Sequence, residues 1–104
     1  MAISPTQLTL RMLRKQGYRA EVVERWNPHA MIRQDLFKCI DVIAIGKGET
    51  VGVQSTSYKN VASRVRKMAD AEAIGDLREA GWRLFVHGWR KPKHRWEVRE
   101  VDIS

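Results

Sequence analysis

Three polar side chains interrupt two stretches that otherwise alternate like β-strands. Residues 40–57, IDVIAIGKGETVGVQSTS, surround a glycine-rich turn, and their polar members are Asp41, Gln54 and Thr56. An acid and an amide in the middle of a small sheet are costly unless they are paired or bind a ligand. We therefore take these three residues as the candidate site.

The turn determines which residues face each other across this hairpin. A two-residue turn at Lys47 and Gly48 places Asp41 directly opposite Gln54, with a Cβ separation of about 4.5–5.5 Å. Thr56 lies two residues beyond Gln54 and so on the same face of its strand. The spacing predicts one polar constellation.

Such a constellation suits a hard divalent cation, because Mg²⁺ and Mn²⁺ prefer oxygen ligands. We expect Asp41 to be the leading metal ligand, Gln54 the second, and Thr56 a group that positions water or phosphate. Two alternatives stay open: Asp41 caps a backbone turn, and Gln54 and Thr56 bond only to each other and to the neighbouring strand.

The charge balance favours a polyanionic partner. Nineteen Lys and Arg against twelve Asp and Glu give a formal net charge of +7. Nucleic acid is the commonest partner of such a chain. A basic surface that serves only solubility is the alternative.

Length and cysteine content restrict the class of protein. A chain of 104 residues predicts a single domain, residues 1–104, and no apolar run approaches the ~20 residues that span a bilayer. Cys39 is the only cysteine, which favours a reducing compartment. Because the N-terminus lacks the pattern of a signal peptide, we expect the cytoplasm of a bacterium, or of a host cell if the gene is carried by a phage.

Periodicity and chain breakers predict the order α-β-β-β-α-β-β. Ser4 and Pro5 open a helix that ends near Gly17. Strands are expected at 18–26, 40–45, 50–57, 82–88 and 95–103, a helix at 60–81 with a bend at Gly75, and a loop at 29–37. The crossover through the second helix joins a parallel pair. The expected class is α/β, a mixed central sheet flanked by helices.

This arrangement resembles the PD-(D/E)XK nuclease superfamily, in particular its small Holliday-junction-resolvase-like and phage VRR-NUC-like forms. Asp41 matches the first acid, and GVQST places Gln54 at the second acid and Thr56 at the lysine. The segments RQDLFKCID and FVHGWRK are also similar to proteins of this group. The resemblance covers most of the chain. It implies a restriction-endonuclease-like fold and a Mg²⁺- or Mn²⁺-dependent endonuclease that cuts DNA, including branched or junction DNA, as a homodimer.

The same resemblance indicates which residues complete the site. Relatives often carry an acid on the first helix, where Gln7 is the nearest residue here. Glu24 and Asp35 are further candidates to restore the missing negative charge. One of three basic residues is expected to replace the motif lysine: Lys59, Arg64 or Lys67.

Basic residues in four segments are expected to contact a phosphate backbone. They are Arg33, Lys59, Arg64, Lys67, Arg90, Lys91 and Lys93. Aromatic residues interleave with basic ones from Trp89 to Trp96, a pattern suited to base stacking. Two other functions compete with the nuclease: a catalytically inactive nuclease-fold domain that binds nucleic acid, and a protein-interaction domain.

Overall fold

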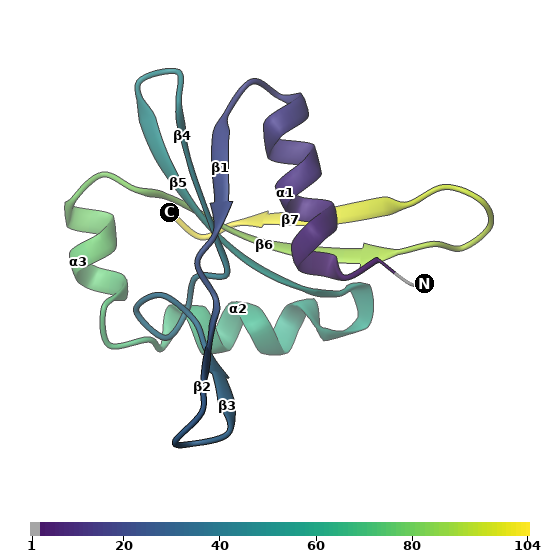
Figure 1. The fold of residues 1–104 in the computed structure, drawn as a ribbon. Coiled ribbons are helices and arrows are strands. Elements are labelled where there is room, and N and C mark those ends of the chain that lie inside the picture. Colours follow the sequence, from purple (N-terminus) through teal and green to yellow (C-terminus); the bar gives the residue numbers. More distant parts are fainter. Residues whose placement is uncertain (1–2) are drawn as a thin grey trace.

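A mixed five-stranded sheet forms the centre of the computed structural model, which describes residues 3–104 (Figure 1). The strand order is β1-β4-β5-β6-β7. These strands span Arg19–Val22 (β1), Val42–Gly46 (β4), Glu49–Ser57 (β5), Arg83–Arg90 (β6) and Glu97–Asp102 (β7). β5 and β6 run parallel, and all the other neighbours in this sheet are antiparallel.

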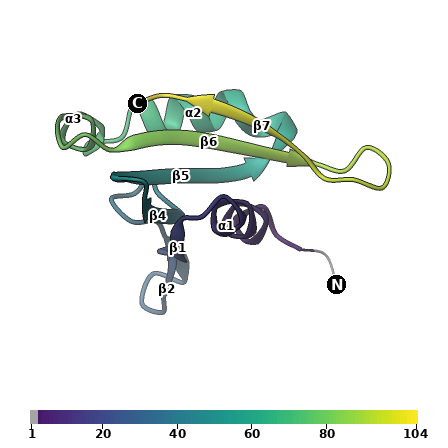
Figure 2. The same ribbon diagram turned by 90° about the horizontal axis from the view of Figure 1, so that it is seen from above.

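Helices cover both faces of the sheet, as seen from above in Figure 2. α1 (Pro5–Lys15) lies on one face, and α2 (Val61–Ala69) lies on the other. A short 3₁₀ helix, η1 (Tyr58–Asn60), leads from β5 into α2, and α3 (Ile74–Glu79) precedes β6. The expected α/β class with a mixed sheet between helices is confirmed. Within residues 3–104, no helix combines the length and the apolar character that crossing a membrane requires.

Alternate residues of the strands build two apolar cores, one under each helix layer. The core on the α1 face includes Leu10, Leu13, Val42, Val51 and Val53. The core on the α2 face includes Ile40, Val61, Met68, Leu84 and Val86. Because successive side chains point to opposite faces, the residue between Val53 and Ser55 on β5 belongs to the α2 side.

The predicted turn and register of the hairpin are confirmed for residues 42–53, but the expected pair of Asp41 and Gln54 lies just beyond the ladder, because Asp41 precedes β4. The five pairs between β4 and β5 run from Val42 opposite Val53 to Gly46 opposite Glu49. Both residues of the turn have positive φ, 55° at Lys47 and 76° at Gly48, as a type I′ turn requires.

The predicted order α-β-β-β-α-β-β is incomplete, because the strand expected at 18–26 is two strands. It ends at Val22 and resumes as β2 (Arg25–Asn27), which leaves the main sheet. β2 pairs with β3 (Ile32–Gln34), which lies in the segment predicted to be a loop. Together they form a separate hairpin that projects below the sheet in Figure 1. Its strands pair only with each other within the described residues.

The helix expected at 60–81 is also two elements. It breaks at residues 70–73, before Gly75, and gives α2 and α3. The break turns the chain so that Met68 of α2 and Leu77 of α3 pack into the same core. A straight helix would not direct both side chains to one place, so tertiary packing decides the break.

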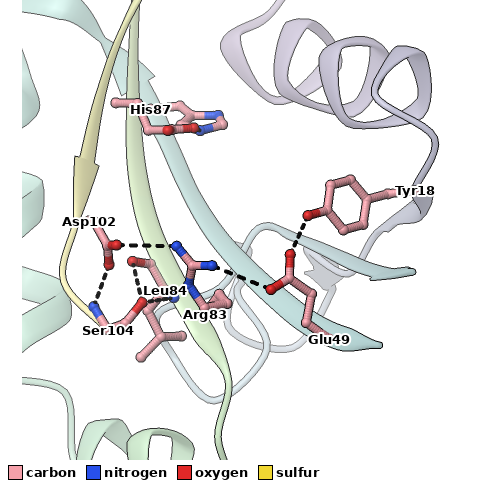
Figure 3. A network of polar contacts seen from close by, with 8 residues as sticks. Tyr18, Glu49, Arg83, Leu84, His87, Asp102 and Ser104 are labelled. Carbon is pink, nitrogen blue, oxygen red and sulfur yellow. Dashed lines mark hydrogen bonds and ion pairs between the residues drawn. The ribbon is translucent and has the colours of Figure 1, made fainter. Parts of the chain in front are cut away.

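A polar network at the opposite end of β5 from the candidate site connects the sheet strands (Figure 3). Arg83 lies 3.3 Å from the carboxylates of both Glu49 and Asp102. Tyr18 donates a hydrogen bond to Glu49, and the backbone of Ser104 donates one to Asp102 at 2.9 Å. Exposed ion pairs contribute little each, but together they hold β5, β6 and β7 in register at this end.

We expect Gly88→Ala to destabilise the fold, because β6 and η1 approach each other closely. A Cβ at Gly88 would lie 2.1 Å from Val61 Cγ2 and 3.1 Å from the backbone of Tyr58. Relieving this overlap should cost about 1–3 kcal/mol. Chemical unfolding measures the loss. Gly75→Ala is the control, since nothing lies within 4 Å of its Cβ; an equal loss in both variants would refute the close packing.

Candidate metal and nucleic-acid site

An open cleft of about 1120 Å³ lies where β4 begins. Its walls come from the start of α1, the β2–β3 hairpin with the loop that follows it, the end of β5, and α2. The polar residues that line it are Thr6, Glu24, Arg25, Arg33, Gln34, Asp35, Lys38, Asp41, Ser55, Arg64 and Lys67. Acidic and basic groups therefore face the same space.

Three carboxylates meet in this cleft. Glu24, Asp35 and Asp41 each offer one oxygen, and these atoms all lie within 4.8 Å of one another. Asp41 directly precedes β4, whereas Glu24 and Asp35 flank the β2–β3 hairpin, whose first pair is Arg25 opposite Gln34. The hairpin thus brings two acids to Asp41 that are 11 residues apart in the chain.

Asp41 is held firmly and is 4% exposed. Its Oδ2 accepts a hydrogen bond from the Ser55 amide at 2.8 Å. Its own amide donates to Val53 O at 2.9 Å, and its carbonyl accepts from Val23 N at 2.8 Å. The Asp41 side chain thus accepts a hydrogen bond from a β5 amide that lies beyond the first residue of β4. The alternative that Asp41 caps the backbone is therefore present in the structure. The carboxylate also bonds to Asp35.

The pKa values of the neighbouring carboxyls Asp35 and Asp41 shift in opposite directions. Burial first, and then the hydrogen bond with Asp35, raise the pKa of Asp41 to about 7. Burial also opposes ionisation of Asp35, but hydrogen bonds from Asp41 and Gln54 and the charge of Lys67 outweigh it and lower the pKa of Asp35. As the pH falls, Asp41 is therefore the first carboxyl of this pair to take up a proton.

Gln54 lies beside these acids with an unusual deficit. It is 1% exposed, and its Nε2 donates to Asp35 Oδ2 at 3.2 Å. Its Oε1 is buried and has no hydrogen-bond partner within the described part of the chain, a costly state. Rotating the amide end exchanges the two atoms. It would then direct Oε1 toward the acids, where a cation could satisfy it.

The donor set fits a divalent cation. Three carboxylates and one amide oxygen are hard oxygen ligands of the kind that Mg²⁺ and Mn²⁺ prefer. A divalent charge would also replace the proton on Asp41 and relieve the crowding of the acids. Glu24, Asp35, Asp41 and Gln54 are thus the residues that could hold the ion.

Two basic residues of α2 face the acids. Lys67 Nζ lies 3.5 Å from Asp35 Oδ2, and Arg64, one turn earlier, also lines the cleft. Arg33 lies 3.1 Å from Glu24. Of the three residues expected to replace the motif lysine, Lys59 alone does not line the cleft, because it is exposed on η1.

Besides Lys59, three of the residues predicted for the catalytic and metal site do not line the cleft. One is Gln54, which reaches the acids through its hydrogen bond to Asp35; the other two are Thr56 and Gln7. Thr56 is 5% exposed, pairs with Gly88 of β6, and does not line the cleft. Gln7 is exposed on α1, and its neighbour Thr6 lines the cleft instead. The structure therefore places neither Gln7 nor Thr56 where it could touch a phosphate in the cleft.

The predicted basic residues near the C-terminus lie on the long β6–β7 hairpin, which extends to one side in Figure 1. Arg90 stacks on the Tyr58 ring at 4.0 Å and pairs with Glu97. Lys91 lies 5.5 Å from the centre of the Trp96 ring, and Lys93 is exposed in the loop. These cations form a second basic surface outside the cleft.

Trp89 was expected among the stacking residues, but it belongs to the interior. It is 9% exposed, and its Nε1 donates to Thr9 Oγ1 at 3.0 Å. Ser55 Oγ donates to the same hydroxyl at 2.9 Å. Thr9 therefore gives its own proton to His87 Nδ1, 3.2 Å away, and His87 Nε2 donates to Glu100 at 2.8 Å.

This series of buried hydrogen bonds was not predicted, although the sequence contains a signal for it. Thr9 lies among the apolar residues of α1, and His87 alternates with buried strand residues. These hydrogen bonds fix Ser55, whose amide holds Asp41. They thus support the site from the other face of the sheet.

Comparison of the chain with protein families, with curated proteins and with solved structures finds no match. The function of the cleft is therefore inferred from its own side chains and from their arrangement.

The raised pKa of Asp41 makes stability depend on pH. The folded protein holds a proton up to about pH 7 that the unfolded chain, with a pKa near 3.8, has already released. Stability should therefore fall as pH rises from 5 to 8. We expect the thermal midpoint in EDTA to drop by several degrees over this range. Glu24 and Asp35 lie beside this carboxyl, and Lys67 lies 3.5 Å from Asp35.

Asp41→Asn should flatten this pH profile, because the amide does not titrate. Asp76→Asn, on the exposed side of α3, is the matched control and should keep the wild-type slope. A wild-type midpoint that rises toward pH 8, or the same slope in Asp41→Asn, would contradict the assignment.

Proposed function

We propose that this protein is a metal-dependent endonuclease that hydrolyses phosphodiester bonds of DNA in the cleft. The observation that carries the proposal is the convergence of Glu24, Asp35 and Asp41 within 4.8 Å, beside the Gln54 amide oxygen that has no hydrogen-bond partner among residues 3–104. When bound there, Mg²⁺ or Mn²⁺ supplies Lewis acidity toward the phosphate and lowers the pKa of a water.

The remaining roles belong to the basic side chains. Lys67, 3.5 Å from Asp35, places an ammonium group beside the acids and so can orient a phosphate there. It occupies the functional place of the lysine that Thr56 replaces in the motif. Arg64, one helical turn away, is positioned for the neighbouring phosphate. Because these two residues share α2, they present charge along one wall of the cleft.

The topology supports the restriction-endonuclease-like part of the proposal. Asp41 directly precedes β4, Gln54 lies on the antiparallel neighbour β5, and a helical crossover leads from β5 to the parallel strand β6. This is the sequence of elements that the resemblance implies. A cytoplasmic site of action and a homodimer are parts of the same proposal.

A catalytically inactive nucleic-acid-binding domain is the second candidate, and one observation favours it. Gln54 donates to Asp35 and Lys67 pairs with it, so this acid is satisfied without an ion. The exchange of an acid for Gln54 and of a lysine for Thr56 reduces the charge that the nuclease motif supplies. Such a domain would keep the basic surface and bind without cutting.

Asp41→Asn should abolish Mg²⁺- or Mn²⁺-dependent cleavage, because it removes the central carboxylate of the cluster. It should also remove the rise in thermal midpoint that either metal gives the wild type. Cleavage is measured on linear, nicked, single-stranded and four-way-junction DNA. Asp76→Asn is the control and should cut and bind metal as the wild type does.

The opposite outcomes are equally definite. If the wild type cuts none of these substrates with either metal, and Gln54→Glu combined with Thr56→Lys restores cutting, the protein is the inactive binder. If Asp41→Asn cuts as well as the wild type, the active site lies elsewhere.

The basic residues of the β6–β7 hairpin should contribute affinity through phosphate contacts. Replacing Lys91 and Lys93 by alanine should reduce the slope of log affinity against log salt by roughly two. Arg64→Glu with Lys67→Glu should weaken binding to all sequences. Fluorescence anisotropy in EDTA measures both effects. Lys15→Ala on α1 is the control, and an unchanged slope in the double alanine variant would exclude the hairpin from the interface.

A further inference from the structure

The β2–β3 hairpin carries exposed side chains on both of its faces. Trp26 is 52% exposed and Ile32 is 51% exposed, and Met31 at the turn is 69% exposed. Single exposed apolar side chains are common on protein surfaces, so the groups beside them decide what this hairpin could bind. The hairpin positions Glu24 and Asp35 at its base, so whatever binds it lies next to the acids.

The register separates the two faces. Trp26 is directly opposite Arg33, so these two side chains share one face, here called the outer face. Arg25 is opposite Gln34, and Ile32 is opposite Asn27, on the inner face. Arg25, Gln34 and Ile32 line the cleft, and so does Arg33 of the outer face, whereas Trp26 does not.

Charge indicates what binds there. Residues 25–34, RWNPHAMIRQ, contain two arginines and no acid. Each face combines one arginine with one large apolar side chain, and neither face carries a contiguous apolar area. A stable protein interface buries about 800 Å² on each partner, which single side chains on a narrow ribbon do not provide. An aromatic ring beside a cation instead matches a nucleotide, which offers a flat base and a phosphate.

We propose that the outer face binds an unpaired nucleotide, with its base stacked on Trp26 and its phosphate at Arg33. The strand that reaches the acids lies along the inner face, next to Arg25. Bases inside a duplex are covered by their neighbours, so Trp26 selects nucleic acid with a single-stranded segment beside the cleft. This inference rests on the proposed function for its substrate, but it concerns binding and not cleavage.

Arg33 is suited to this role. Its side chain is 72% exposed although its Nη1 lies 3.1 Å from Glu24, so a phosphate can reach the guanidinium from solvent. The turn that orders the tip is also built in: Asn27 Oδ1 accepts hydrogen bonds from the amides of His29 and Ala30 at 3.0 and 3.2 Å. The outer face is therefore presented in a defined shape.

The test compares a single-stranded oligonucleotide with a duplex of the same length, by fluorescence anisotropy in EDTA. Trp26→Ala should weaken binding of the single strand by roughly ten-fold, the loss expected for one stacked base, and binding of the duplex by less than two-fold. Trp26→Phe should restore most of the affinity. Ile45→Ala is the matched control, because Ile45 is 51% exposed on β4 and should leave both affinities unchanged.

The outcomes separate this inference from the proposed function. Loss of single-strand selectivity in Trp26→Ala supports the inference even if no variant cuts DNA. An unchanged affinity, or an equal loss for duplex and single strand, overturns it even if Asp41 proves essential for cleavage. It is also overturned if sedimentation shows a wild-type dimer that Trp26→Ala converts to monomer, because the outer face would then bind a second copy.

Discussion

The constraint on which the rest of this structure depends is the crowding of negative charge at the start of β4. Three carboxylates within 4.8 Å, one of them almost fully buried, repel one another and are poorly solvated. Four groups offset this repulsion: Asp41 itself through its raised pKa, the ammonium of Lys67, the guanidinium of Arg33 and the amide of Gln54. Each of these groups comes from a different element, so the acids hold those elements in relation to one another.

The difference in length between β4 and β5 creates the opening that these groups surround. β5 extends beyond Val42, the first residue of β4. Without Asp41, the amide of Ser55 would therefore lack a hydrogen-bond acceptor on this side. Asp41 supplies the acceptor, and in doing so its carboxylate is fixed at the edge of the sheet and not in the middle of a face. The same extension of β5 leads into η1 and α2, which brings Lys67 over the cleft. One strand thus positions both the acid and the base.

The sequence predicts what is determined locally. A type I′ turn and period-two alternation fix the β4–β5 register, so Asp41 and Gln54 could be placed together from the chain alone. The meeting of Glu24 with Asp35 could not, because β2 and β3 are three residues each and carry no alternation. The approach of Lys67, and not of Lys59, to Asp35 depends on how α2 lies over the sheet. The packing of Met68 and Leu77 into one core decides the position of α2 and where it ends.

The series of buried hydrogen bonds through Thr9 and His87 has a consequence for α1. A helix that packs only through an apolar stripe can shift along a sheet, since after a displacement of one turn its apolar side chains still contact apolar side chains. The hydroxyl of Thr9 finds its hydrogen-bond partners at one position only, between the donors Ser55 Oγ and Trp89 Nε1 and the ring nitrogen of His87. A shift of the helix would leave several buried polar atoms without hydrogen-bond partners. Thr9 therefore fixes the position of α1 along its own axis relative to the sheet.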